Sequence, residues 1–191
     1  IIINQGLKKY GGDLAIGAFG IVNRLVFIVV MIVMGLNQGM QPIAGYNFGA
    51  KLYGRVNKVL RLTIIYATAV TTFGFLVGML VPDLVVGIFT SDAELTELSV
   101  TGLRITVMFF PIIGFQMVTS NFFQSIGMAG KAIFLSLTRQ MLILLPCLLV
   151  LPQFFGVAGV WYSMPVSDLL ASLIALVMLV CQFRKFRTSP L

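Results

Sequence analysis

The chain has 191 residues, of which 59% are hydrophobic and 10% charged, and its net charge is +7. Average soluble domains are about 45–50% apolar and about 25% charged, so this composition excludes an ordinary soluble globule. The apolar residues fall in blocks close to the ~20 residues that cross a bilayer, which predicts an all-α integral membrane protein.

Charge and residue usage argue against several functional classes. The basic residues flank apolar blocks instead of forming a basic face on a soluble body, so we expect no nucleic-acid partner. Histidine is absent, which removes the commonest general base and transition-metal ligand, so we expect neither an enzyme, a metal site nor another cofactor. Cys147 and Cys181 lie in separate apolar runs and are expected to be small buried hydrophobic residues, not a disulfide.

Five apolar runs set the expected membrane topology. They cover residues 14–36, 62–81, 105–126, 133–151 and 160–183. We therefore expect one membrane domain over residues 1–191 with five complete transmembrane helices, and residues 1–5 as the end of a sixth, truncated span. The glycines and charges of residues 6–13 predict a loop.

Proline, glycine and aromatic residues within these runs predict a bend and a position at the membrane surface. Pro111 and Gly114 predict a bend in the third run, because a membrane helix tolerates proline where neighbours satisfy the freed carbonyl. Trp161, with its neighbour Tyr162, is expected at the headgroup level where the last run begins.

The basic residues predict the orientation. One side of the membrane collects Lys51, Arg55, Lys58, Arg61, Lys131, Arg184, Lys185 and Arg187, with Arg139 near it. Because cytoplasmic loops are enriched in lysine and arginine, this side is expected to be cytoplasmic, with the C-terminus on it. The expected location is the inner (plasma) membrane, with the lipid bilayer around a multi-pass protein.

Residues 35–55, GLNQGMQPIAGYNFGAKLYGR, join an apolar run to this basic segment. We expect the chain to leave the helix here and to form an inner hinge. The expected hinge residues are Gln41, Pro42, Gly45, Asn47 and Gly49. The glycines and proline would release the helix, and the amides would bond to the freed backbone.

Three ionisable residues are expected at membrane depth, namely Arg24 and Asp168 within the apolar runs and Arg104 closer to an edge. Such a group costs roughly 2.5–3.5 kcal/mol on insertion scales, so it normally faces a bundle interior or a watery cavity. One hypothesis pairs Asp168 with Arg24 or Arg104, and the alternative is that each arginine snorkels to the outer headgroups. The candidate substrate-cavity residues are Asn23, Arg24, Arg104, Gln116, Asn121 and Asp168; hydrogen bonds between packed helices explain the amides equally well.

Four segments carry a family resemblance. They are the Asn23-Arg24 pair, GLNQGMQPIAGYNFGAK at 35–51, FFQSIGMAGKAIFLSLTRQ at 122–140 and GVAGVWYSMPVSD at 156–168. In this order and spacing they resemble multidrug and toxic compound extrusion (MATE) transporters of the bacterial multidrug branch.

The resemblance implies one lobe of a twelve-helix transporter, with this chain as the C-terminal lobe and the N-terminal lobe as its partner. It implies secondary active efflux of small organic cations or drugs in exchange for sodium ions or protons. The family's coupling-ion site is built around an Asp of the first span, and this chain would not contain it. Two alternatives stay open: a transporter that flips lipid-linked oligosaccharides, and a structural membrane subunit that transports nothing.

Overall fold

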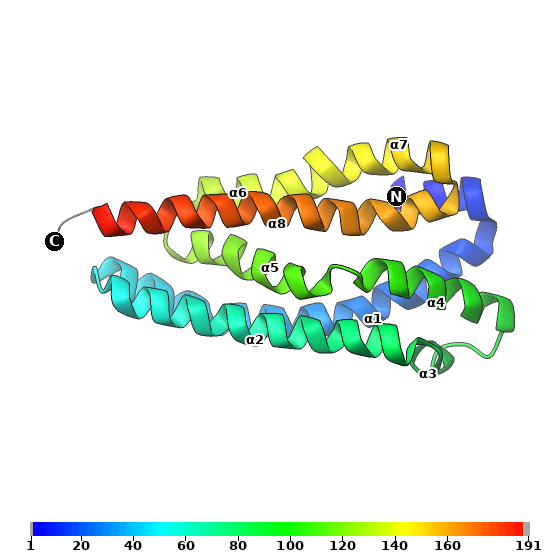
Figure 1. Cartoon of the computed structure of the whole chain (residues 1–191), viewed down its shortest axis with the longest axis horizontal. Helices are drawn as coiled ribbons and strands as arrows, with labels where there is room; N and C mark the ends of the chain where they lie inside the picture. The colour runs from blue at the N-terminus through cyan, green and yellow to red at the C-terminus, as the bar shows by residue number, and fades with distance from the viewer. Residues whose placement is uncertain (1, 189–191) are drawn as a thin grey trace.

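The computed structural model describes residues 2–188, and every regular element in this range is a helix (Figure 1). The elements are α1 (Ile2–Gly49), α2 (Tyr53–Leu80), α3 (Pro82–Gly87), α4 (Ala93–Val107), α5 (Phe110–Ser125), α6 (Ala129–Leu137), the π-helical segment η1 (Thr138–Leu144), α7 (Leu145–Phe155) and α8 (Val157–Thr188). The expected all-α fold is confirmed.

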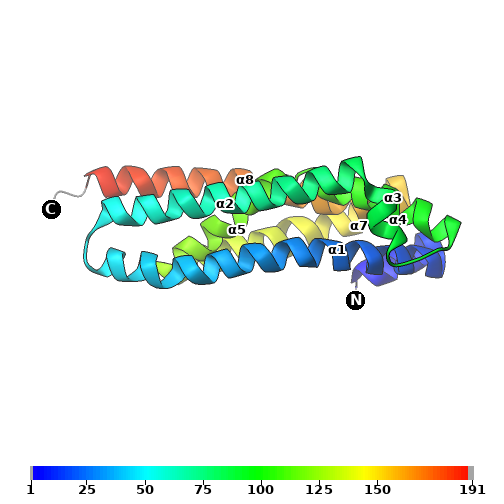
Figure 2. The same ribbon diagram turned by 90° about the horizontal axis from the view of Figure 1, so that it is seen from below.

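The helices form an elongated bundle around α5. In Figure 1, α6, α7 and α8 lie on one side of α5 while α1 and α2 lie on the other, and Figure 2 shows the turn that joins α1 to α2 at the end of the bundle where α8 ends. Helix α5 contacts α1, α2, α6 and α8. Its fully buried Val118, Phe122 and Phe123 anchor the main apolar cluster, which also receives Leu60 of α2 and Leu179 of α8.

The described part of the chain is built for a bilayer. Four helices are long and apolar enough to cross it, and α4 with α5 makes a fifth candidate if this bent pair is one span. Large apolar side chains also point outward, such as Phe73, 69% exposed, and Leu80, 75% exposed. An outward apolar surface of this kind fits contact with lipid.

The predicted loop at residues 6–13 is wrong, because these residues are helical within α1. The glycines instead supply a kink: Gly12 has φ 67° and ψ −162°, a conformation that suits a residue without Cβ. Leu7 is fully buried and packs with Ala15 and Val160, so apolar contacts hold this segment helical.

The predicted exit from the helix within residues 35–55 is present but comes late, because α1 continues through Pro42 and Gly45 to Gly49. Glycine in a helix interior costs only about 1 kcal/mol, and a membrane helix tolerates Pro42 where neighbours satisfy the backbone. The chain turns only at Lys51, which has φ 57°, and α2 begins two residues later.

The predicted bend in the third run is confirmed. Helices α4 and α5 are inclined by 54° to each other across a two-residue break, and Pro111 stands in the first turn of α5, where its missing N–H is not needed. Helix α4 begins behind Asp92, whose Oδ1 accepts a hydrogen bond of 3.0 Å from the backbone N–H of Leu95.

Helices α7 and α8 form an antiparallel hairpin about Gly156, which has φ 59°. Trp161, near the start of α8, is 1% exposed and lies 5.8 Å from Phe19 between ring centroids. Packing against α1 and Gly102 of α4 buries the Trp161 ring inside the bundle, and its expected position at the headgroup level stays a prediction. Cys147 is half-buried, whereas Cys181 is exposed on α8 and so departs from the expected burial; both are free.

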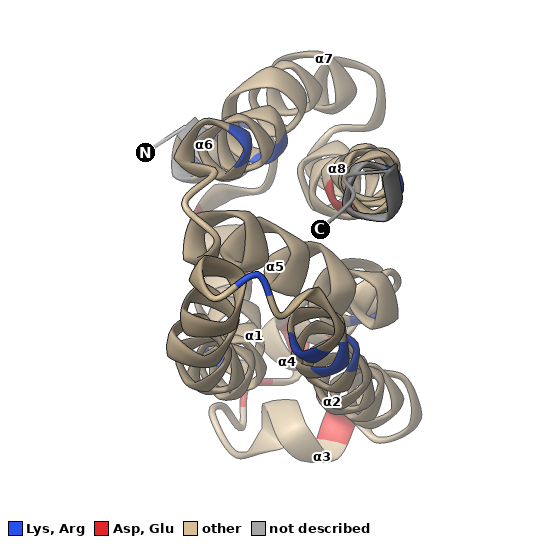
Figure 3. Ribbon diagram, turned by 90° about the vertical axis from the view of Figure 1, so that its left-hand side faces the viewer, with Lys and Arg blue, Asp and Glu red and all other residues tan. Residues whose placement is uncertain are grey.

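Basic and acidic residues separate along the bundle, and Figure 3 looks onto the basic end, with Lys and Arg in blue. One end carries Lys51, Arg55, Lys58, Arg61, Lys131 and Arg184, in the α1–α2 turn, the starts of α2 and α6, and the end of α8. Asp83, Asp92, Glu94 and Glu97 lie in α3 and at the start of α4, at the opposite end. The fold therefore places these basic residues and these acidic residues at opposite ends of the bundle, as the sequence predicted.

Candidate functional site

Helix α8 carries a stripe of buried small and polar residues. Ser163, Ser167, Asp168 and Ser172 are each at most 6% exposed. Ser163 Oγ donates to the carbonyl of Gly159 at 2.8 Å, and Ser172 Oγ donates to that of Asp168 at 2.6 Å. These bonds satisfy the hydroxyls within the helix, and the small side chains let neighbouring helices approach closely.

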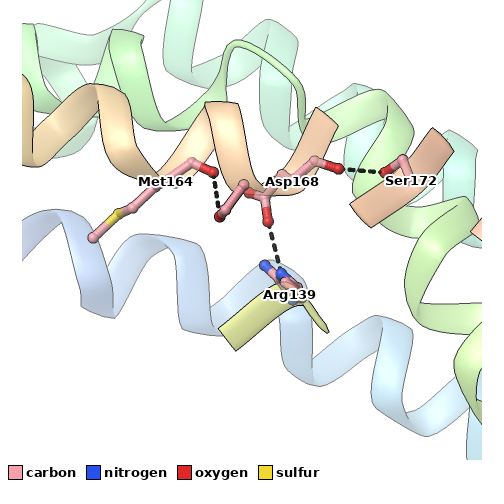
Figure 4. Close-up of polar contacts among 5 residues, drawn as sticks. Arg139, Met164, Asp168 and Ser172 are labelled. Carbon is pink, nitrogen blue, oxygen red and sulfur yellow. Dashed lines mark hydrogen bonds and ion pairs between the residues drawn. The ribbon is translucent and has the colours of Figure 1, made fainter. Parts of the chain in front are cut away.

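Asp168 of this stripe forms an ion pair with Arg139 of η1. Arg139 Nε donates to Asp168 Oδ1 at 2.7 Å, as Figure 4 shows. The Asp168 side chain is 8% exposed and that of Arg139 is 31% exposed. An ionised group at this depth requires a partner, so the pair ties the middle of α8 to the preceding span.

The helix widens at the point where it presents Arg139. Residues Thr138–Leu144 form a π-helix, and Pro146 follows directly in the first turn of α7. Proline cannot donate to the carbonyl four residues earlier and its ring crowds that turn, which accounts for the irregular segment before it. π-Helical turns recur at functional sites, and here the turn carries the arginine of the ion pair with Asp168.

The predicted pairing of Asp168 with Arg24 or Arg104 is wrong. Both arginines are exposed on this chain, on α1 and α4. Arg139 was expected near the cytoplasmic side because its apolar run was counted from residue 133. The helix begins at Ala129, so Arg139 lies ten residues, or about 15 Å, from the start of the helix.

A second polar contact joins α1 to α5 near the basic end. Gln41 Nε2 donates to Asn121 Oδ1 at 3.3 Å, and Asn121 Nδ2 donates to the carbonyl of Met117 at 2.9 Å. Gly45 lies so close to α5 that an added Cβ would stand 2.9 Å from the carbonyl oxygen of Ser125. The expected hinge is thus a tight helix–helix contact.

The other expected hinge and cavity residues fall in different places. Asn47 is buried and donates to the carbonyl of Ile43 at 2.8 Å, whereas Pro42 and Gly49 are exposed. Asn23 is exposed beside Arg24, and Gln116 is buried in α5. The structure therefore does not gather the candidates into one cluster, and their role on a substrate path stays a prediction.

Asn37, an amide of the expected hinge segment, is a further functional candidate. It is 2% exposed in α1, and neither its amide nitrogen nor its amide oxygen has a hydrogen-bond partner. It lies one turn before Gln41, on the face that meets α5. In the part of the chain that the structure describes, no group of three His, Cys, Asp or Glu side chains is placed to hold a metal ion.

Comparison with known proteins places the chain in a family. The MatE family model matches residues 1–149. The multidrug export protein MepA of Staphylococcus aureus (strain MSSA476) is 28% identical over 176 residues, which are 92% of this chain and 38% of MepA. The protein of the same name from Staphylococcus saprophyticus is 24% identical over the same length.

Solved structures agree. That of the MATE multidrug transporter DinF-BH in complex with R6G is 37% identical, with a TM-score of 0.83 over 96% of this chain and 41% of that one. An outward-facing multidrug resistance MATE family transporter has a TM-score of 0.90 at 18% identity, over 98% and 43% of the two chains. The chain thus spans about two fifths of the length of its relatives. With a family model that matches well over half of its residues, this chain belongs to the MatE family of multi-pass membrane transporters.

Proposed function

We propose that this chain is the C-terminal lobe of a secondary active transporter that expels small organic cations and drugs in exchange for sodium ions or protons. The observation that carries the proposal is the match to DinF-BH, named a multidrug transporter, over 96% of this chain but only 41% of that protein. An N-terminal lobe of similar size would account for the remaining length. We expect neither half to transport alone, because alternating access needs two units that move around a shared site.

The fold supports a lobe that moves as one body. Its TM-score is 0.90 against an outward-facing MATE family transporter and 0.88 against an inward-facing one. A unit that fits both conformations nearly equally well need not rearrange internally during transport. The ion pair between Arg139 and Asp168 would help to keep α8 and the preceding span together in both states.

The charge distribution supports an orientation. Six lysine and arginine side chains gather at the end of the bundle where α2 begins and α8 ends, and cytoplasmic connections carry such an excess. We therefore propose that this end, with the C-terminus, faces the cytoplasm in the plasma membrane.

The coupling ion is proposed to bind in the other lobe. Asp168 is the carboxylate that lies within a predicted span, and it already holds Arg139 as its counter-ion. The substrate is proposed to meet the exposed members of the candidate set, which are Asn23, Arg24 and Arg104. A substrate that binds here would contact surfaces that this chain leaves for the partner lobe to complete.

Transport by the full-length protein tests this proposal. The protein is reconstituted into liposomes, and movement of R6G or ethidium is followed under an imposed sodium or proton gradient. We expect one of the two gradients to drive dye movement, and dissipating it to stop that movement. No gradient-dependent movement of either dye, with a partner protein that co-purifies in fixed ratio, would instead favour a structural subunit.

A further inference from the structure

A pocket lies between α2 and α8 at the basic end of the bundle. Its volume is about 620 Å³, within the range of about 300–1,000 Å³ that is usual for small-molecule sites. The residues that line it are Tyr53, Asn57, Leu60, Arg61, Ile64, Ile65, Val180, Phe183 and Arg184. Figure 3 shows the two helices on the same side of the bundle at this end.

The charge of the pocket favours an anion. Arg61 of α2 and Arg184 of α8 face it from opposite helices, and no aspartate or glutamate is among its lining residues. The carboxylates of the described chain lie in the middle of α8 or toward the far end of the bundle. A phosphate is well suited to two guanidinium groups, because each can donate a pair of parallel hydrogen bonds.

The depth of the pocket matches a lipid molecule. The 28 residues of α2 span about 42 Å, the thickness of a bilayer with its headgroups. Tyr53 and Asn57 therefore stand in the headgroup layer, and Ile65, three turns further along, reaches the hydrocarbon. Arg61 of α2 and Arg184 of α8 line the same pocket, so the two helices place their basic side chains beside each other.

The apolar wall of the pocket separates a lipid from a soluble anion. Ile65 is 51% exposed and Val180 is 43% exposed, directly beside the arginines. Free phosphate would leave this apolar surface unused, whereas an acyl chain would cover it and gain about 25 cal/mol for each Å² removed from water.

We propose that this pocket binds one anionic phospholipid. Its phosphate lies between Arg61 and Arg184, its headgroup meets Tyr53 and Asn57, and an acyl chain follows the apolar wall. Basic pockets between membrane helices on the cytoplasmic side are suited to such headgroups. The inference needs the membrane location and the structure of the pocket, and it does not depend on what the protein transports.

Native mass spectrometry of the full-length protein tests the proposal. The protein is equilibrated with mixed micelles of phosphatidylglycerol and phosphatidylcholine, and the lipids retained per copy are counted. We expect preferential retention of one phosphatidylglycerol. Arg61→Gln with Arg184→Gln should weaken this retention roughly thirtyfold, since each basic residue near the surface contributes about 1 kcal/mol.

The matched control removes two charges at the same end but outside the pocket, with Arg55→Gln and Lys58→Gln. It should retain phosphatidylglycerol like the wild type. A second variant, Ile65→Trp, keeps both arginines and fills the exposed apolar wall, and it should also lose the lipid. Size-exclusion elution at the wild-type position shows that each variant is folded.

Three outcomes would overturn the proposal. In the first, the wild type shows no preference for phosphatidylglycerol over phosphatidylcholine. In the second, the two double variants lose phosphatidylglycerol equally. In the third, the variant with Arg61→Gln and Arg184→Gln retains it as the wild type does. Equal loss would mean that the basic end attracts anionic lipid only through its overall charge. Because the readout is lipid retention, failure here leaves the transport proposal standing, and failure of transport leaves this one standing.

Discussion

Removing Arg139 should destabilise the protein more than removing its partner Asp168. The two side chains share one contact of 2.7 Å, but Asp168 is 8% exposed while Arg139 is 31% exposed. Arg139→Met therefore leaves a carboxylate that water barely reaches. Asp168→Asn leaves a guanidinium on a long side chain that can turn toward water or the headgroups.

The expected magnitudes follow from these exposures. A buried pair that loses one member costs about 3–5 kcal/mol, so we expect about 3 kcal/mol for Arg139→Met. Loss of a hydrogen bond to a charged group costs about 1.5–3 kcal/mol, and the more exposed Arg139 puts Asp168→Asn near the lower figure. The double variant should cost only about 1.5 kcal/mol, which gives a coupling energy of about 3 kcal/mol.

The assay is a double-mutant cycle on the free energy of unfolding, measured by SDS titration in mixed micelles. Arg104→Met serves as the control, because it removes the same side chain at an exposed position and should change stability by less than about 0.5 kcal/mol. Equal losses of unfolding free energy for Arg139→Met and Arg104→Met would show that the ion pair contributes nothing. So would a double variant whose loss equals the sum of the losses for Arg139→Met and Asp168→Asn.

Three further predictions concern the basic end and the orientation. Gly45→Ala should lower the free energy of unfolding by about 1–3 kcal/mol, because the new Cβ would stand 2.9 Å from a backbone oxygen of α5. The control Gly39→Ala has open space around it and should be neutral or stabilising in the same titration. Equal effects of the two variants would contradict the close approach of α1 to α5. Asn121→Ala should cost only about 0.6 kcal/mol, the average for a hydrogen bond between membrane helices, and a loss above about 2 kcal/mol would indicate a larger role. In a cysteine-free background, Lys51→Cys should react with an impermeant maleimide only from the cytoplasm and Glu94→Cys only from outside; the reverse pattern would invert the proposed orientation.

Features that depend on chain composition over a whole span were predictable from the sequence. A bilayer leaves no alternative to helix for long apolar runs, so the all-α fold followed from composition alone. The bend before Pro111 followed in the same way, because proline removes one backbone donor wherever it stands in a helix. The separation of basic from acidic residues also needed only their order along the chain.

Features that depend on packing were missed. The glycines and charges of residues 6–13 predicted a loop, but the burial of Leu7 holds the segment helical, and helical geometry is interrupted only at Gly12. The glycines from residue 35 to 49 likewise read as a helix exit, although Gly45 is there to let α1 approach α5. In both cases a contact with a helix distant in sequence decides the outcome, and local propensity does not register such contacts.

The partner of Asp168 was missed because depth was counted from the first strongly apolar residue. Helix α6 starts four residues earlier, and Arg139 lies in a π-turn that no propensity predicts. The sequence did contain a signal: Arg139 is the cation within the apolar run 133–151, which folds back on α8 through the hairpin at Gly156. Adjacent antiparallel spans are the first place to seek a counter-ion.

The proposal that this chain is one lobe of a two-lobed exporter can be tested directly. Its most direct test is gradient-driven R6G efflux from liposomes that contain either the full-length protein or residues 1–191 alone, each inserted to the same density. We expect efflux from the full-length protein and none from residues 1–191. Efflux by residues 1–191 alone, at a rate comparable to that of the full-length protein, would contradict it.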